Sequence, residues 1–562
     1  MTSCVDAIER ALDAIERHNR PEVWITLRGR DELLDEARRR DTEGPLPLRG
    51  MVLAVKDNID VAGLPTTLGL PLPRASTVSD RDAPAVARLR EAGAIVIGKT
   101  NLDQFATGLV GTRSPYGAVR NAFWPDRISG GSSSGSAVAV ALGMADIALG
   151  TDTAGSGRVP AALNRIVGIK PTLGLVPVIG MRDACRPFDT ITVFARDVET
   201  AAAAAAVMVG PDVHDGLSRT VPARRRRAAP IRPVLGIPRD EDLASLDDHA
   251  RQAWSVAIAR WTDVAELIAL DISPLVAVAR LLYNGAIVAG RYAAAGEFLS
   301  DQDGLDPTVA SIVGQAESVA GWQYVRDRAT LDRARADALI ALHGLDGLII
   351  PTTPGHPTLE EVAADPIAVN AWMGTFTNFV NLLDFAAIAV PLNDGTDRGF
   401  GTTIVTRAFE DDVALDLAAR YLDVPQPAAL VDDGIDLAVF GAHLLGQPLN
   451  RELVERGARF MRTIATEATY ALFALDTVPP KPGLVPQASG GASITGELWR
   501  LSPGDLGSFL AQLPAPMTLG RVRLQGGDEV VGFGCTTLSL EHATNITEHG
   551  SWPAYLAAQD SE

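Results

Sequence analysis

Short apolar runs alternate with helical stretches from residue 48 onward, and this alternation constrains the fold more than any other feature. Residues 51–55 (MVLAV) and 94–97 (AIVI) are β-rich, and residues 83–92 between them have helical spacing. Strands that alternate with helices in this way favour an α/β domain with a largely buried sheet. The pattern continues past Pro391, so we predict one large α/β domain over residues 1–425.

The alternation ends near Tyr421, where a segment rich in Pro, Asp and Gly begins. This punctuation is typical of an interdomain linker, which we place at residues 426–436. Residues 437–562 follow, with Gly-rich turns, two or three helical stretches and strand-like runs at 438–440, 496–501, 517–524 and 530–533. They predict a small α+β domain. A chain of 562 residues with 47% apolar composition can bury both cores.

Residues 224–227 are four successive arginines, flanked by Pro and Ala within residues 222–233. Two interpretations are open, a solvated loop and a binding patch. The block is short and the rest of the chain is acidic, so we predict a solvated loop.

The charge balance narrows the class of partner. Fifty Lys and Arg face 69 Asp and Glu, a net charge of −19, so nucleic acid or an anionic membrane would bind against the overall field. A small molecule is the expected substrate. The longest apolar stretches fall short of the roughly 18 residues that a membrane span needs.

Cysteine usage and the start of the chain indicate a compartment. Cys4, Cys185 and Cys535 lie far apart and lack the spacing of a disulfide framework or a zinc site, so we expect no metal and a reducing environment. The first residues read as an amphipathic helix and have no basic segment followed by an apolar one. We therefore predict a soluble, cytoplasmic protein.

Two turns of small residues present serine hydroxyls. Residues 129–136 (SGGSSSGS) precede an Ala-rich helical run, and residues 150–160 (GTDTAGSGRVP) form the second turn. Neither turn matches a nucleotide-binding motif. Such turns expose a hydroxyl and let backbone amides converge on the oxygen of an attacked carbonyl. They indicate a serine hydrolase.

The serine needs a base, and no Gly-x-Ser-x-Gly elbow or well-placed His supplies one. A buried, neutral lysine can act as base, whereas arginine cannot give up its proton. Only four lysines occur, at 56, 99, 170 and 481, so 46 of the 50 basic residues are arginine. Lys56 ends an apolar run and is the first candidate. Lys99 is the rival, and a lysine that snorkels from a strand end is the alternative.

These segments, in this order, resemble the amidase signature family. The similarity includes residues 55–58 (VKDN), 98–105 (GKTNLDQF), both serine turns and 168–172 (GIKPT), and it extends over roughly residues 1–425. The resemblance implies the amidase signature fold, in which helices cover a mixed central sheet. It also implies amide hydrolysis with no cofactor.

The resemblance assigns roles to residues of the two turns. Ser156 is implied as the nucleophile, Ser132 as a bridging serine on a cis peptide, and neutral Lys56 as the base. The backbone amides implied for the oxyanion hole are those of Thr153, Ala154, Gly155 and Ser156. Ser133, Ser134 and Ser136 are expected to be structural, and Asp152 and Arg158 to brace the turn.

Details within the motifs resemble the allophanate hydrolases of this family. The sequence Ala-Gly-Ser-Gly-Arg at 154–158 and residues 378–384 (NFVNLLD) carry this similarity. Allophanate is a urea that bears a carboxylate, for which arginine offers a bidentate fork. Tyr283 and Arg291 are eight residues apart, slightly more than two helical turns, and are expected to share a helix face and hold the carboxylate. Asn284, residues 286–287 and Gly290 depart from the expected pattern.

The end of the chain supports the same choice. Residues 439–444 (VFGAHL) and 480–484 (PKPGL) look like the C-terminal domain of allophanate hydrolases, whose fold is similar to the γ-glutamylcyclotransferase group. The resemblance implies that the first domain releases ammonia and leaves N-carboxycarbamate, which the second domain helps to decarboxylate. His443 is the candidate acid or base, because imidazole titrates in the useful range. Glu497 and His549 are further candidates.

Three alternatives remain open. The chain could be a general amidase or glutaminase of the same family, a non-catalytic binding protein of this fold, or an amidase whose C-terminal domain serves only in docking. The expected partners are a second copy of the chain in a homodimer and a urea carboxylase in the same pathway. Light scattering that shows only monomer would contradict the dimer.

Overall fold

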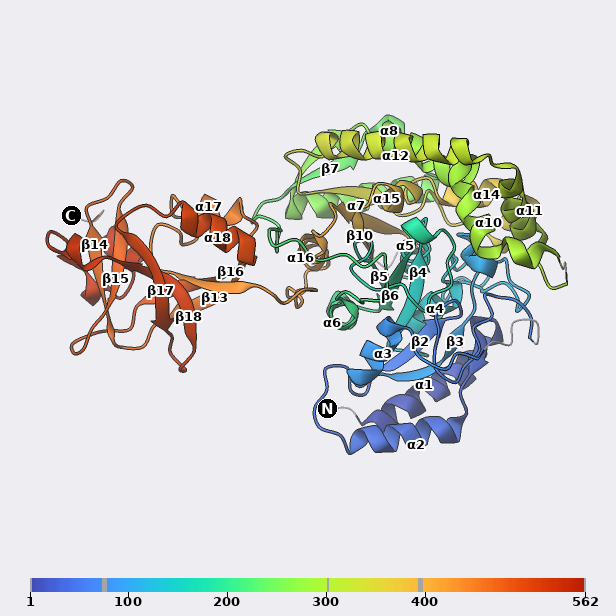
Figure 1. Cartoon of the computed structure of the whole chain (residues 1–562), viewed down its shortest axis with the longest axis horizontal. Coiled ribbons are helices and arrows are strands. Elements are labelled where there is room, and N and C mark those ends of the chain that lie inside the picture. Colours follow the sequence, from blue (N-terminus) through green and yellow to red (C-terminus); the bar gives the residue numbers. More distant parts are fainter. Residues whose placement is uncertain (1–2, 73–77, 301–302, 393–397, 560–562) are drawn as a thin grey trace. The chain divides into compact units, whose positions relative to one another are not determined.

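The computed structural model describes residues 3–72, 78–300, 303–392 and 398–559. The chain divides into two compact units, each of which is described by itself (Figure 1). The first comprises Met1–Val221 and Arg232–Leu430, and the second Pro222–Ile231 and Val431–Glu562. The predicted combination of a large α/β fold and a small α+β fold is confirmed.

One mixed sheet of 11 strands runs through the first unit, in the order β1-β3-β2-β4-β6-β5-β10-β11-β9-β7-β8. The β2, β3 and β4 strands are parallel, as are β7, β8 and β9, and the strands between these groups pair antiparallel. The strands are β1 Trp24–Leu27, β2 Val52–Lys56, β3 Ile95–Thr100, β4 Ile147–Asp152, β5 Val167–Lys170, β6 Thr190–Ala195, β7 Val234–Pro238, β8 Glu266–Leu270, β9 Gly347–Pro351, β10 Ala386–Pro391 and β11 Gly401–Thr406.

Helices cover this sheet, with α1 and α2 at the β2 and β3 end (Figure 1). The helices are α1 Cys4–His18, α2 Arg30–Asp41, α3 Pro84–Glu91, α4 Ser134–Ala141, α5 Arg158–Leu163, α6 Val198–Met208, α7 Asp248–Val264, α8 Ser273–Ala279, α9 Leu281–Asn284, α10 Ala289–Ala295, α11 Pro307–Gln315, α12 Gly321–Ala341, α13 Leu359–Ala364, α14 Ala368–Met373, α15 Asn378–Leu382 and α16 Asp411–Leu422.

The central strands read as continuous apolar runs because both faces of the sheet are covered. Every residue of β2, β3 and β4 is buried. The α1 helix begins at Ser3, whose hydroxyl accepts the amide of Val5, and it buries Cys4, Ile8 and Ala11 in the core. This packing places the polar ends of β2 and β4 inside the unit.

The second unit contains a five-stranded sheet, β13-β16-β12-β18-β17, and a three-stranded sheet, β15-β14-β19. Its strands are β12 Ile435–Val439, β13 Arg459–Ala465, β14 Tyr470–Leu475, β15 Lys481–Pro486, β16 Thr495–Leu501, β17 Met517–Arg523, β18 Glu529–Cys535 and β19 Thr544–Asn545. Its helices are α17 Asn450–Val454, α18 Pro503–Ala511 and α19 Trp552–Gln559. The four predicted strand runs correspond to β12, β16, β17 and β18.

The arginine block at 224–227 is where the structure differs most from the prediction. It lies in Pro222–Ile231, the segment that groups with the second unit although it interrupts the first in sequence. Arg225 and Arg227 are buried, whereas Arg224 is exposed. The predicted solvated loop is therefore wrong for these two residues.

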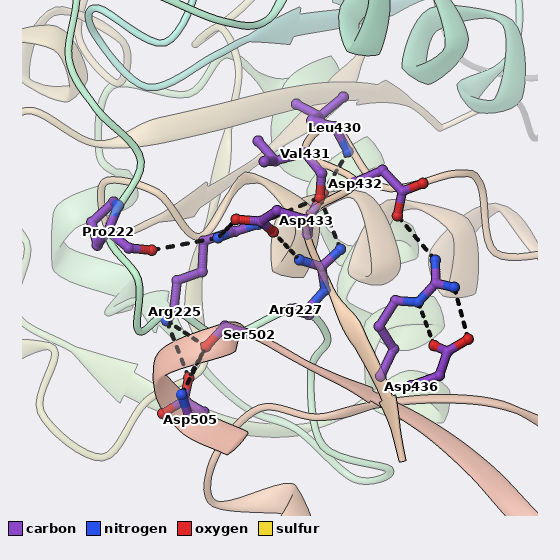
Figure 2. A network of polar contacts seen from close by, with 12 residues as sticks. Pro222, Arg225, Arg227, Leu430, Val431, Asp432, Asp433, Asp436, Ser502 and Asp505 are labelled. Carbon is purple, nitrogen blue, oxygen red and sulfur yellow. Dashed lines mark hydrogen bonds and ion pairs between the residues drawn. The ribbon is translucent and has the colours of Figure 1, made fainter. Parts of the chain in front are cut away.

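A shared carboxylate explains the burial of the two arginines. Arg225 forms a two-pronged ion pair with Asp433, and Nη1 of Arg227 lies 2.8 Å from Oδ1 of the same side chain (Figure 2). Arg227 also donates to the carbonyl of Val431 at 2.8 Å. The backbone amide of Arg225 donates to Asp505 at 3.2 Å. These contacts attach the segment to β12 and α18.

Among the residues described, no single helix is both long and apolar enough to cross a bilayer. Ser273–Asn284 and Ala286–Ser300, bent by 46° at their junction, pass together by length and composition alone.

Replacing Asp433 with alanine should destabilise the second unit, because Arg225 and Arg227 would lose their shared carboxylate. Unpartnered buried polar groups cost about 1–3 kcal/mol each, less where water reaches them. Hydrogen exchange followed by mass spectrometry should show faster exchange in Pro222–Ile231 and β12, with β2 unchanged. Hydrogen bonds from Arg225 hold the pKa of Asp433 below its usual value. The effect should thus be full at neutral pH and disappear as pH falls through that lowered pKa.

The matched control is Asp432→Ala. Asp432 is exposed and bonds to Arg500, which keeps its second partner Asp436. Equal exchange in both variants would contradict the role given to Asp433.

Candidate active site

Lys56, the last residue of β2, is fully buried between two hydroxyl groups. Its Nζ lies 2.8 Å from Oγ of Ser132 and 2.7 Å from Oγ1 of Thr151. Burial lowers the pKa of Lys56 to about 7. A large share of the side chain is therefore neutral near pH 7 and able to accept a proton.

The geometry also separates Lys56 from its rival. Nζ of Lys99 lies 2.9 Å from Oδ1 of Asp57, in a buried ion pair away from the serine turns. Lys170 donates to the carbonyl of Pro171 at 2.8 Å. Only Lys56 among these three is bonded to a serine of the two turns.

Ser132 follows a cis peptide bond from Gly131, as the sequence resemblance implied. Gly131 has no room for a side chain, because a Cβ there would lie 2.1 Å from a carboxylate oxygen of Asp103. That carboxylate accepts the amides of Gly111 and Arg113, both at 3.0 Å. Asp103 thus supports the first turn, a role that the sequence motifs did not reveal.

The neighbouring serines of the first turn bond to the backbone. Ser133 donates to the carbonyl of Thr151 at 3.1 Å, Ser134 to that of Asn101 at 3.4 Å, and Ser136 to that of Leu149 at 2.8 Å. These contacts fit the structural role expected for them.

The second turn, between β4 and α5, is organised by Asp152. Its carboxylate accepts the amides of Gly155 at 2.8 Å and Gly157 at 3.0 Å, and it forms a two-pronged ion pair with Arg158 at 2.9 and 3.0 Å. Burial would raise the pKa of Asp152, but Arg158 outweighs that effect and holds it below its usual value. The turn is therefore braced by a permanent charge pair, as expected.

Three of the four predicted oxyanion amides are available. In the described part of the chain, the amides of Thr153, Ala154 and Ser156 donate no hydrogen bond within the protein. The amide of Gly155 differs from the prediction, since it donates to Asp152. Gly155 is instead required sterically: its φ is +130°, and a Cβ would lie 2.4 Å from Oγ1 of Thr377.

The hydroxyl of Ser156 donates to the carbonyl of Gly108 at 3.4 Å. No hydrogen bond joins the hydroxyls of Ser132 and Ser156 within the described ranges. The link from Lys56 to Ser132 is thus formed, and the link onward to Ser156 needs a rotation of the Ser156 side chain.

Arg291 and Tyr283 come together as predicted, but by a different route. Nη2 of Arg291 lies 2.9 Å from Oη of Tyr283, and the guanidinium carbon lies 4.8 Å from the ring centre. The single helix assumed from their spacing is wrong. The α9 helix ends at Asn284, and α10 begins only at Ala289. The carboxylate of Asp327 accepts the amide of Ala286 at 2.7 Å inside the break.

Arg291 is a buried cation that lacks an acidic partner among the described residues. It is 2% exposed, and its other amino group donates to Oγ1 of Thr107 at 2.9 Å. Nε has no partner. A buried, unpaired guanidinium is costly, so this position favours an anionic ligand.

Tyr283 also lines a cleft of about 360 Å³ in the first unit. Asn284, Asn370 and Asn378 contribute polar groups to this cleft, and Oδ1 of Asn378 is buried without a partner. Asn378 follows Thr377, which packs on Gly155. In the sequence, Asn378 stood out only as part of a motif.

Asp189 is another buried residue that was missed. Its carboxylate accepts the hydroxyl of Thr153 at 2.5 Å and the amides of Ala184 and Cys185. Burial raises the pKa of Asp189. A search for motifs could not find it, since no pattern surrounds it.

His443 lies in the second unit, just after the end of β12. Its ring stacks on Phe533 at 4.9 Å and meets the edge of Phe509, and Nε2 lies 3.2 Å from Oε2 of Glu452. Burial lowers the pKa of His443.

The two weaker candidates of the second unit have other contacts. Glu497 accepts the amide of Leu445 at 3.0 Å and the indole of Trp499 at 3.0 Å. His549 is beside Glu548 and Tyr555. In the described residues, no group of three or more His, Cys, Asp or Glu is placed to hold a metal ion.

The fold, with two serine turns around a buried lysine, defines a class. The chain belongs to the amidase family of amidohydrolases, whose model matches residues 6–415. A second model, described as the allophanate hydrolase C-terminal domain, matches residues 435–557.

Individual relatives narrow the comparison. The urea amidolyase of Lachancea kluyveri is 38% identical over 95% of this chain, which spans 31% of that protein. The structure of selenomethionine-substituted Kluyveromyces lactis allophanate hydrolase has a TM-score of 0.87 and 36% identity, and covers 99% of this chain and 97% of its own. A glutamyl-tRNA(Gln) amidotransferase from Symbiobacterium thermophilum is 32% identical over 75% of this chain and 93% of its own length.

The reactivity of Ser156 should rise with pH through about 7, because Lys56 accepts the serine proton only when it is neutral. The rate of labelling by a fluorophosphonate probe measures this without a substrate. We expect no labelling of Ser156→Ala and at least 100-fold slower labelling of Lys56→Met. Ser134→Ala is the control and should label at nearly the wild-type rate. A flat pH profile between 5 and 9 would exclude Lys56 as the base.

Proposed function

We propose that the first unit hydrolyses allophanate to ammonia and N-carboxycarbamate. The observation that carries the proposal is Arg291, a buried cation beside Tyr283 without an acidic partner among the residues described. A substrate with a carboxylate next to its amide would complete this ion pair. The similarity to allophanate hydrolase and to urea amidolyase supports the same substrate.

The geometry suggests how the first reaction proceeds. Ser156 attacks the amide carbonyl, and its proton passes through Ser132 to neutral Lys56. The free amides of Thr153, Ala154 and Ser156 stabilise the oxyanion. The proton then returns to the leaving nitrogen, ammonia departs, and water hydrolyses the acyl enzyme.

The second unit is proposed to assist the next step, the decarboxylation of N-carboxycarbamate. The match to the allophanate hydrolase C-terminal domain supports this assignment. His443 is the proposed acid, since it is buried among aromatic rings and bonded to Glu452.

The alternatives fit fewer observations. A general amidase or glutaminase would not need the buried Arg291, and a binding protein would not need a lysine bonded to Ser132. The homodimer, the urea carboxylase partner and the cytoplasmic location stay predictions. The similarity to urea amidolyases supports a place in urea degradation, and the cysteine content supports the location.

Arg291→Ala should lower kcat/KM for allophanate by at least 100-fold, or about 3 kcal/mol at 1.4 kcal/mol per tenfold. Ammonia release from allophanate, malonamate and neutral amides measures the effect. Arg280→Ala is the matched control, because Arg280 is an exposed residue at the rim of the same cleft. A preference for neutral amides with a silent Arg291→Ala would leave a general amidase.

His443→Ala should release the first ammonia at the wild-type rate but decompose N-carboxycarbamate more slowly. ¹³C NMR of labelled allophanate follows both species. A chain that ends near Asp432 is a poor test, because Pro222–Ile231 belongs to the second unit and would be left without its partners. Equal decay in His443→Ala and wild type would refute a catalytic second unit.

A further inference from the structure

All four lysines of this arginine-rich chain are buried, with exposed fractions from 0 to 8%. Three of them, Lys56, Lys99 and Lys170, lie in the first unit and have the hydrogen-bond partners given above. The fourth, Lys481, lies in the second unit. Within the described residues, its ammonium group has neither a hydrogen-bond acceptor nor a carboxylate within 4.0 Å.

Lys481 begins β15 and lines a small pocket of the second unit. The same pocket is lined by His443 and by residues 439–442, at the end of β12. Its remaining walls are apolar and include Met517 and Phe533. Among the described residues, no acidic side chain lines it, and Glu452 reaches His443 without being part of the lining.

A buried ammonium without a partner is costly, and a chain that uses arginine at 46 of 50 basic positions rarely places a lysine at random. The cost is removed when an anion enters the pocket and pairs with the ammonium. The observed pocket thus has one fixed cation, one titratable imidazole and, in the part of the chain described, no competing carboxylate.

We propose that Lys481 binds a carboxylate group of a small dicarboxylate in this pocket and presents the ligand to His443. The inference rests on the proposed second step, for which it names the residue that holds the substrate. The ligand class is a dianion with two carboxylates one atom apart, as in N-carboxycarbamate or malonate.

The step balances with one proton. Lys481 pairs with the carboxylate that is retained, and His443 delivers a proton to the central nitrogen. The bond between that nitrogen and the other carboxylate carbon breaks, its electron pair stays on nitrogen, and carbon dioxide and carbamate result. Carbamate then takes up protons and yields ammonia and a second carbon dioxide.

The charges around His443 fit this sequence of events. Without a ligand, burial lowers the pKa of His443, hydrogen bonding to Glu452 opposes this, and Lys481 lowers it further. A bound dianion offsets the charge of Lys481 and favours the protonated imidazole. The proton is therefore taken up when the substrate arrives.

The kinetic test compares Lys481→Met with Lys481→Arg in the full chain. Lys481→Met should release the first ammonia at the wild-type rate while N-carboxycarbamate, followed by ¹³C NMR, decays at least tenfold more slowly. Lys481→Arg should recover part of the rate. Arg521→Met, which removes an exposed cation from β17, is the matched control and should decay as wild type does.

A second measurement needs no variant. Malonate should slow hydrogen exchange in β15 and in residues 439–443 of the wild-type chain. Absence of this protection, or wild-type decay in Lys481→Met while His443→Ala is slow, would overturn the role of Lys481 and leave the proposed function intact. Wild-type decay in both variants would refute the proposed second step itself.

Discussion

The buried ion pair between Asp152 and Arg158 is the interaction on which the active site depends. The Asp152 carboxylate takes the amides of Gly155 and Gly157, and Arg158 extends to the carbonyl of Thr377 and the side chain of Asn381. Both charges are fully buried, so the pair is tolerated only because each charged group is also hydrogen-bonded. It fixes the turn, the position of Ser156 and the packing of α15 in one arrangement.

Much of this site could be predicted from the sequence because its parts are local. Each serine turn is a continuous segment, and Lys56 ends a strand whose apolar run is plain in the sequence. The choice between Lys56 and Lys99 could not be made from residues alone, since it depends on Asp57, which pairs with Lys99. The oxyanion amides were predicted as a group, but the amide of Gly155 is held by Asp152.

Other features depend on residues that are distant in sequence. The partner of Arg225 and Arg227 is Asp433, 208 and 206 residues further on, so the arginine block looked like a surface loop. The pairing of Tyr283 with Arg291 was predicted on the assumption of one continuous helix. The helix is broken at Gly285, where Asp327 binds the backbone, and the two side chains still meet.

The inclusion of Pro222–Ile231 in the second unit has a consequence for synthesis on the ribosome. This segment emerges long before Asp433 and α18 exist, so its arginines stay hydrated until nearly the whole chain has been made. The first unit is likewise interrupted by it and must close around a stretch that folds elsewhere. The second unit therefore completes its folding last, and neither half of the chain corresponds to a gene fragment that could be separated by a single cut.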